Sequence, residues 1–136
     1  MLMTALMALL SVPALHAEQP APVPAPVITA LCDDNFESAI VGLGSAAGLV
    51  LFVATEYNLS KRQLEIFKAF STQRPADEVK FFTVEVNQCS KVVVSQQIRR
   101  VPSVVLYQEG GKLGELSSLS DPISADQLTE LVGKMR

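Results

Sequence analysis

Two cysteines and one histidine are the residues whose chemistry decides most about this chain. Cys32 and Cys89 are too few for a zinc site built from cysteines alone, although they suffice for one disulfide. The only histidine, His16, lies in an N-terminal segment that we expect to be removed, so the mature chain would have no imidazole. We therefore exclude Ser-His-Asp triads, Cys-His dyads and histidine metal sites, and we expect neither a metal nor a cofactor.

Length and charge limit the classes of partner. The 136 residues are enough for one domain, and 49% of them are hydrophobic, which is typical of a globular chain. The formal net charge is −3, and the chain contains no long basic run. Binding to nucleic acid requires lysine and arginine side chains gathered against phosphates, so nucleic acid is not an expected partner.

The N-terminus predicts export. Residues 1–12 (MLMTALMALLSV) form a nearly unbroken apolar run, followed by Pro13 and by small residues at cleavage positions. Residues 1–17 are therefore interpreted as a secretory signal peptide cleaved after Ala17, with Ala14 as the alternative position. The run is shorter than the ~20 residues that span a bilayer, so a retained membrane anchor is the weaker alternative. The expected location is a periplasm, a secretory lumen or the medium outside the cell.

Residues 18–27 (EQPAPVPAPV) predict a linker. Four prolines alternate with small residues in this segment. Such a composition favours extended polyproline II and cannot pack a core. We expect a solvated tether ahead of one folded domain, residues 28–136, and the alternative is a recognition segment for a partner.

The first half of the folded domain predicts strand, helix and strand. A strand is expected over 27–31, then a helix whose N-cap lies within 33–35 and which ends at the glycines of 42–48. These glycines are superficially similar to a dinucleotide-binding loop, but that loop follows a strand and begins a helix, which is the reverse of the order here. The run LVLFVA over 49–54 predicts a central strand buried on both faces.

The second half continues the alternation. Ser60 is expected to cap the next helix, glycines after Glu109 indicate a hairpin turn, and Ser124 to Gln127 has the pattern of a capping box. The elements expected here are a helix over 61–71, a strand over 79–86, a short helix over 89–97, strands over 104–107 and 112–116, and a final helix. The resulting order, β-α-β-α-β-α-β-β-α, predicts an α/β fold in which helices flank a central mixed sheet of three parallel strands and a C-terminal antiparallel hairpin.

This order, in a unit of just over 100 residues, resembles the thioredoxin fold. The acidic segment 33–36 is similar to the start of the first helix in thioredoxins and protein disulfide isomerase domains. The strand at 49–54 is similar to their central strand, and Lys61 to the lysine that follows their redox motif. The most specific match is 98–107 (IRRVPSVVLY), which is similar to the family's Ile-Arg-x-Ile-Pro-Thr segment. The resemblance covers residues 28–136.

The resemblance also implies that the family's redox centre is missing. It places Tyr57-Asn58-Leu59-Ser60 where the family has Cys-x-x-Cys. Disulfide exchange needs an attacking thiolate and a second thiol, which a phenol and an alcohol cannot supply. Glu56 stands at the position of the family's tryptophan, and Leu51 at that of its buried carboxylate. We therefore expect no catalytic residue, and we interpret Tyr57 and Ser60 as degenerate redox-motif positions.

A binding edge that does not depend on sulfur is implied as well. In thioredoxins a cis-proline loop lies beside the redox motif and pairs with extended substrate peptides through backbone hydrogen bonds. By resemblance, Pro102 follows a cis peptide bond, and an extended segment could dock here by strand addition with Tyr57 as an aromatic anchor. The residues predicted for this surface are Tyr57, Asn58, Arg100, Val101 and Pro102. The alternative is that Pro102 only shapes a turn of the core and that Arg100 is solvated.

The two cysteines are also placed by the resemblance. Cys32 would follow the first strand and Cys89 the third, and these strands are parallel neighbours in thioredoxin sheets. We therefore expect one structural disulfide, formed in an oxidising compartment. The alternatives are two unrelated cysteines or a catalytic pair, although their spacing contains no redox motif.

The sequence thus predicts an exported, redox-inactive thioredoxin-like domain that binds a protein or an extended peptide segment, or serves as a scaffold. The alternative function is a thiol-disulfide oxidoreductase or isomerase helper that uses Cys32 and Cys89. Hydrolase or transferase activity has little support in a mature chain without histidine. A membrane would be contacted only through an uncleaved leader.

Overall fold

The computed structural model describes residues 27–74 and 78–136. The predicted signal peptide (1–17), the linker up to residue 26, and Pro75 lie outside the described residues. Within the described part, no helix is long and apolar enough to cross a membrane. In chain order the elements are β1 (Ile28–Leu31), α2 (Phe36–Val41), β2 (Ala47–Val53), α3 (Asn58–Ser71), β3 (Val79–Glu85), α4 (Ser90–Ser95), β4 (Ser103–Gln108), β5 (Gly111–Ser117) and α5 (Ala125–Val132).

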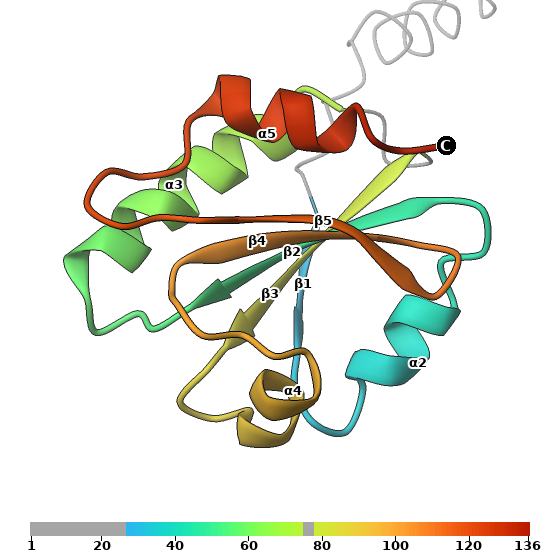
Figure 1. The fold of residues 1–136 in the computed structure, drawn as a ribbon, viewed down its shortest axis with the longest axis horizontal. Helices are drawn as coiled ribbons and strands as arrows, with labels where there is room; N and C mark the ends of the chain where they lie inside the picture. Colours follow the sequence, from blue (N-terminus) through green and yellow to red (C-terminus); the bar gives the residue numbers. More distant parts are fainter. Residues whose placement is uncertain (1–26, 75–77) are drawn as a thin grey trace, which may run out of the picture.

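A five-stranded mixed sheet forms the centre of the fold, with the strand order β1-β3-β2-β4-β5. Strands β1, β3 and β2 are parallel, whereas β4 is antiparallel to β2 and forms a hairpin with β5. Figure 1 shows helices α3 and α5 on one side of the sheet and α2 and α4 on the other. The predicted fold class and the predicted order of elements are both confirmed.

Strand β2 is buried on both faces. All seven of its residues are buried. On one side it pairs with β3, where Val50 lies opposite Phe82, and on the other with β4, where Phe52 lies opposite Ser103. A continuous apolar run is typical of a strand that is covered from both sides, as the sequence predicted.

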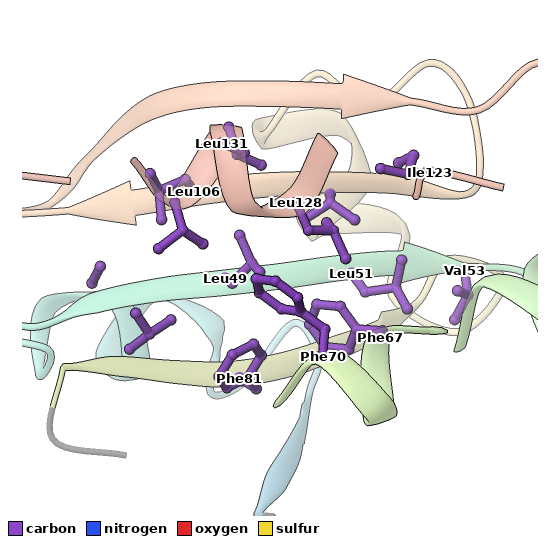
Figure 2. Packing of buried hydrophobic residues seen from close by; sticks show 14 residues of the cluster. Leu49, Leu51, Val53, Phe67, Phe70, Phe81, Leu106, Ile123, Leu128 and Leu131 are labelled. Atoms are coloured by element: carbon purple, nitrogen blue, oxygen red, sulfur yellow. The ribbon is translucent and has the colours of Figure 1, made fainter. Parts of the chain in front are cut away.

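The first hydrophobic layer lies between the sheet and helices α3 and α5 (Figure 2). Phe67 and Phe70 of α3 meet Phe81 of β3 edge to face, with ring centroids 5.5 and 6.1 Å apart. Leu128 and Leu131 of α5 belong to the same layer. Because large buried side chains dominate core energetics, this layer holds α3 firmly against the sheet.

The second hydrophobic layer lies between the opposite face of the sheet and helices α2 and α4. The ring of Phe36 in α2 packs against Phe52 of β2 and Tyr107 of β4, with centroids 6.3 and 5.7 Å apart. Val92 of α4 is buried in the same layer. The two layers together explain why β2 carries no polar side chain.

Gly48 lies inside β2, whereas the sequence analysis placed it in the loop before the strand. A Cβ atom at this position would lie 2.8 Å from Leu43 Cδ1 and 3.2 Å from Phe82 Cε2. The absence of a side chain therefore lets Leu43 and Phe82 close over the strand. The turn before β2 is made by Gly44, whose φ of 62° lies in the left-handed region.

Helix α3 begins three residues earlier than predicted, and Ser60 is not its N-cap. The N-cap is Tyr57, whose side chain makes no capping hydrogen bond. Ser60 is fully buried in the first turn, where its Oγ accepts a hydrogen bond from the Ala54 N–H at 3.1 Å. The hydroxyl expected at the helix end therefore satisfies a buried backbone group that follows β2.

The hairpin turn and the capping box predicted near the C-terminus are both confirmed. Glu109 and Gly110 connect β4 to β5 with φ values of 55° and 82°, the conformation that a tight hairpin requires. Ser124 and Gln127 form the predicted capping box at the start of α5.

A disulfide joins Cys32, which follows β1, to Cys89, which precedes α4. The parallel pairing of β1 with β3 brings the two strand ends to the same edge, and the two Cα atoms lie 5.0 Å apart. The predicted disulfide is therefore present in the structure. Beside it, Asp33 Oδ1 accepts a hydrogen bond from the Val92 N–H, and Asn35 Oδ1 accepts one from the Cys32 N–H. Asn35 is the N-cap of α2, within the predicted range, but its side chain makes no capping hydrogen bond. The two side chains brace the loop and α4.

Gln63 is a fully buried polar side chain between α3 and the segment that leads to α5. Its Nε2 donates a hydrogen bond to the Ile123 carbonyl at 3.0 Å, and its Oε1 accepts one from the Ile123 N–H at 2.6 Å. Ile123 is buried, so water cannot reach its backbone N–H and C=O. Both groups therefore depend on the Gln63 side chain for their hydrogen bonds.

The substitution Gln63→Ala should lower the free energy of unfolding by about 3 kcal/mol, because two buried backbone groups at Ile123 would lose their partners. Urea denaturation measures the loss. The matched control is Gln73→Ala, since Gln73 is exposed, and it should change stability by less than about 0.5 kcal/mol. A similar, small effect of both substitutions would contradict this account of Gln63.

Reduction of the disulfide should lower the free energy of unfolding by about 4 kcal/mol, because the bond closes a long loop in the unfolded chain. The two cysteines are 57 positions apart. Urea denaturation with and without dithiothreitol measures the difference. The double variant Cys32→Ser, Cys89→Ser is the control, and its stability should not respond to dithiothreitol. Equal stability of oxidised and reduced wild type would show that the bond does not stabilise the fold.

Candidate functional site

Tyr57 and Asn58 lie at the start of α3, just after the chain leaves β2. Tyr57 is 58% exposed, and its backbone N–H donates to the Ala54 carbonyl at 3.0 Å in the turn that follows β2. The first turn of α3 contains no acidic residue, and its N-cap makes no side-chain hydrogen bond. Backbone N–H groups in a first turn have no partner within their helix, so this end of α3 is open to an acceptor from outside.

The segment before β4 forms the second part of the predicted surface. The Val101–Pro102 peptide bond is cis, as expected from the resemblance. Pro102 is buried, Val101 is half-buried and Arg100 is exposed. The Pro102 carbonyl accepts a hydrogen bond from the Ser118 N–H at 3.1 Å, which ties the loop to the end of β5.

Strand register relates these two segments. Phe52 of β2 lies opposite Ser103 of β4. The chain continues from Phe52 toward Tyr57 and arrives at Ser103 from Pro102. Both segments therefore lie at the edge of the sheet where β2 and β3 end and β4 begins. Val101 takes part in none of the backbone hydrogen bonds found in the described part of the chain.

Glu85 is a polar residue at this edge that the sequence analysis did not single out. Its Oε1 accepts hydrogen bonds from the Thr55 N–H at 3.1 Å and from the Thr55 hydroxyl at 2.6 Å. Its other oxygen, Oε2, is buried and has no hydrogen-bond partner among the described residues. In the same turn, Asn87 donates a hydrogen bond to Glu56. These contacts fasten the segment before Tyr57 to the end of β3.

A cleft of about 250 Å³ lies at the same edge of the sheet, beside β1, and is distinct from the Tyr57 surface. The disulfide forms part of its wall, together with Leu64 of α3 and Glu85 of β3. Cys32 is half-buried, whereas Cys89 is only 2% exposed. The two cysteine residues therefore differ in their exposure to solvent.

A second hollow, of about 480 Å³, lies between α2 and α4 and is lined in part by Phe36, Lys91 and Tyr107. The Tyr107 hydroxyl donates a hydrogen bond to Gln96 Oε1 at 2.7 Å. Burial, with a smaller effect from the negative charge of Glu115, raises the pKa of Tyr107 well above its ordinary value. Tyr107 is therefore a neutral hydrogen-bond donor that holds the end of α4, with no acid-base role near neutral pH.

Among residues 27–74 and 78–136, no group of three or more His, Cys, Asp or Glu residues is arranged to hold a metal ion. Both cysteines are engaged in the disulfide.

No protein-family model and no curated protein matches this chain. Among solved structures it is similar to the thioredoxin Mala s 13 of Malassezia sympodialis, with 23% identity and a TM-score of 0.70, over 86% of this chain and 97% of that chain. It is also similar to the long form of thioredoxin f from spinach chloroplast, with 19% identity and a TM-score of 0.68, over 82% of this chain and 88% of that chain. At these identities the likeness concerns architecture, and we conclude that the chain has the thioredoxin fold.

Proposed function

We propose that this chain is an exported protein-binding domain that has kept the peptide-docking edge of the thioredoxin fold without its thiol chemistry. The proposed site consists of Tyr57 and Asn58 at the start of α3 and Arg100, Val101 and Pro102 before β4. The ligand is a protein segment in extended conformation. No catalytic step is assigned to these residues.

The observation that carries this proposal is the unpaired backbone at Val101. Neighbouring backbone groups are engaged, since the Arg100 carbonyl accepts from the Ser103 hydroxyl and the Pro102 carbonyl accepts from the Ser118 N–H. Val101 has no such backbone partner in the described part of the chain, and its side chain is only half-buried. Extended peptides bind to unpaired backbone groups of this kind by adding a strand.

Tyr57 supports the same conclusion. A large aromatic side chain that is 58% exposed can bury considerable apolar surface when a partner arrives. The open first turn of α3 offers N–H donors beside it, and a peptide segment carries carbonyl acceptors. Arg100 adds a positive charge to the proposed surface.

The absence of redox chemistry at this position follows from residue types. We propose that Tyr57-Asn58-Leu59-Ser60 occupies the place of the family's Cys-x-x-Cys, because it begins the helix after the buried central strand, as that motif does in the resemblance. The Ser60 hydroxyl is fully buried and bonded to the Ala54 N–H. Neither hydroxyl group can form or break a disulfide.

Export is part of the proposal and depends on residues 1–17. The Cys32–Cys89 disulfide agrees with this location, because disulfides form and persist in oxidising compartments. The partner would then be another exported protein or an envelope assembly.

Peptide binding can be tested with a display library of unstructured twelve-residue peptides. We expect enriched peptides to shift the NMR signal of the Val101 amide and to slow its exchange with solvent. Tyr57→Ala should weaken their binding by roughly tenfold or more, because a central aromatic anchor would be lost. Val94→Ala is the control, since Val94 is 75% exposed on α4, outside the proposed surface, and its affinity should be unchanged. Peptide shifts confined to other parts of the chain, or an unchanged affinity of Tyr57→Ala, would refute the proposed site.

Redox inactivity can be tested by the reduction of insulin with dithiothreitol. We expect the wild-type chain to leave the rate unchanged, because the start of α3 holds no thiol and Cys89 is only 2% exposed, out of reach of a protein substrate. The double substitution Tyr57→Cys, Ser60→Cys is the positive control and should introduce measurable turnover. Acceleration by the wild type that disappears in Cys32→Ser or Cys89→Ser would favour the alternative, an oxidoreductase helper that uses these cysteines.

A further inference from the structure

We propose that the Cys32–Cys89 disulfide is a site of thiol exchange, at which a small cationic thiol attacks Cys32 Sγ through the cleft beside β1. This site goes beyond the proposed peptide-binding function, because it uses neither Tyr57 nor the proline loop. The juxtaposition behind the proposal is a disulfide in the wall of an open, acidic cleft.

The two cysteine residues differ in exposure, and this difference decides which sulfur is attacked. Both cysteines line the cleft, but Cys32 is half-buried and Cys89 is only 2% exposed. The cleft volume of about 250 Å³ is several times the roughly 30 Å³ of one water molecule, so it has room for a small aminothiol. An incoming thiolate therefore reaches Cys32 Sγ, and Cys89 is the leaving group.

The charge of the cleft selects the reagent. The charged side chains that line it are Asp34 and Glu85, both carboxylates, and no lysine or arginine lines it. In addition, Glu85 Oε2 lacks a hydrogen-bond partner among the described residues. A reagent that carries an ammonium group beside its thiol is attracted to this wall, and an anionic thiol is repelled.

The reduced state is accommodated by carbonyl groups already in place. Cys32 Sγ lies 3.3 Å from the Gln88 carbonyl oxygen, and Cys89 Sγ lies 3.6 Å from that of Leu31. A sulfur in a disulfide has no proton to donate, so these contacts become hydrogen bonds only after reduction. Each thiol released by exchange would then have an acceptor, so the disulfide can open without leaving a buried thiol unpaired.

The exchange proceeds in two balanced steps. The reagent thiolate forms a bond to Cys32 Sγ, the bond between the two cysteine sulfurs breaks, and Cys89 leaves with the electron pair and takes a proton from solvent. A second reagent thiolate then attacks the reagent sulfur in this mixed disulfide and releases Cys32 as a thiolate. Two reagent thiols are thus oxidised to one disulfide while the protein disulfide is reduced to two thiols.

The test uses the folded, oxidised full chain and three small thiols: cysteamine (cationic), 2-mercaptoethanol (neutral) and 2-mercaptoethanesulfonate (anionic). Each rate is divided by the rate of the same reagent with hydroxyethyl disulfide, which removes differences in intrinsic reactivity. We expect cysteamine to exceed the sulfonate by about tenfold at low salt, and the ratio to fall in high salt. After acid quenching, peptide mass spectrometry should find the mixed disulfide on Cys32.

Charge variants test whether the selectivity comes from the carboxylates of the cleft or from the charge of the whole surface. Asp34→Asn with Glu85→Gln should bring the ratio of the corrected cysteamine rate to the corrected sulfonate rate close to one. The amide of Gln at position 85 can still accept the hydrogen bonds from Thr55. The matched control is Glu65→Gln, which removes one carboxylate from the exposed surface of α3 and should leave the ratio unchanged. Three results would each overturn the proposal: a mixed disulfide on Cys89, a wild-type ratio near one, or exchange only in denaturant.

Discussion

The burial of β2 on both faces is the constraint on which the rest of the structure depends. A strand that is covered from both sides needs apolar side chains throughout, two neighbouring strands for its backbone groups, and helices above and below. Its neighbours β3 and β4 run in opposite directions, so the C-terminal ends of β2 and β3 and the start of β4 lie at one edge. The start of α3, the segment before β4 and the disulfide all lie at this edge as a result. Their proximity follows from how β2 is buried.

Much of this architecture could be predicted from the sequence because it depends on short local patterns of residue types. The run over 49–54 predicted β2, the Ser124 capping box predicted the start of α5, and glycine after Glu109 predicted the hairpin. Cys32 and Cys89 could be paired once the resemblance made β1 and β3 parallel neighbours. In each case the physical requirement is local, or it follows directly from strand order.

What the sequence did not predict are side-chain hydrogen bonds that form only when the helices pack on the sheet. Ser60 has the residue type of a helix cap, but it is buried and bonded to Ala54 because α3 begins earlier and turns this hydroxyl toward the sheet. The residue type of Gln63 is typical of the exposed surface of a helix. In the structure it is buried and bonded to Ile123, 60 positions away. Glu85 stands at a polar position of the alternating strand over 79–86, which is typical of a solvent-facing side chain. Its hydrogen bonds from Thr55 could not be predicted, because that contact depends on the packed sheet.

Glu85 connects the two parts of this edge physically. One of its oxygens binds the Thr55 backbone and hydroxyl, and so holds the segment that leads to Tyr57. The same side chain contributes negative charge to the cleft that contains the disulfide. Glu85 is half-buried, and of its two oxygens only Oε1 has hydrogen-bond partners among the described residues, whereas the buried Oε2 has none. Glu85 therefore takes part both in holding the segment before Tyr57 and, with Asp34, in the charge selection that we propose at the disulfide.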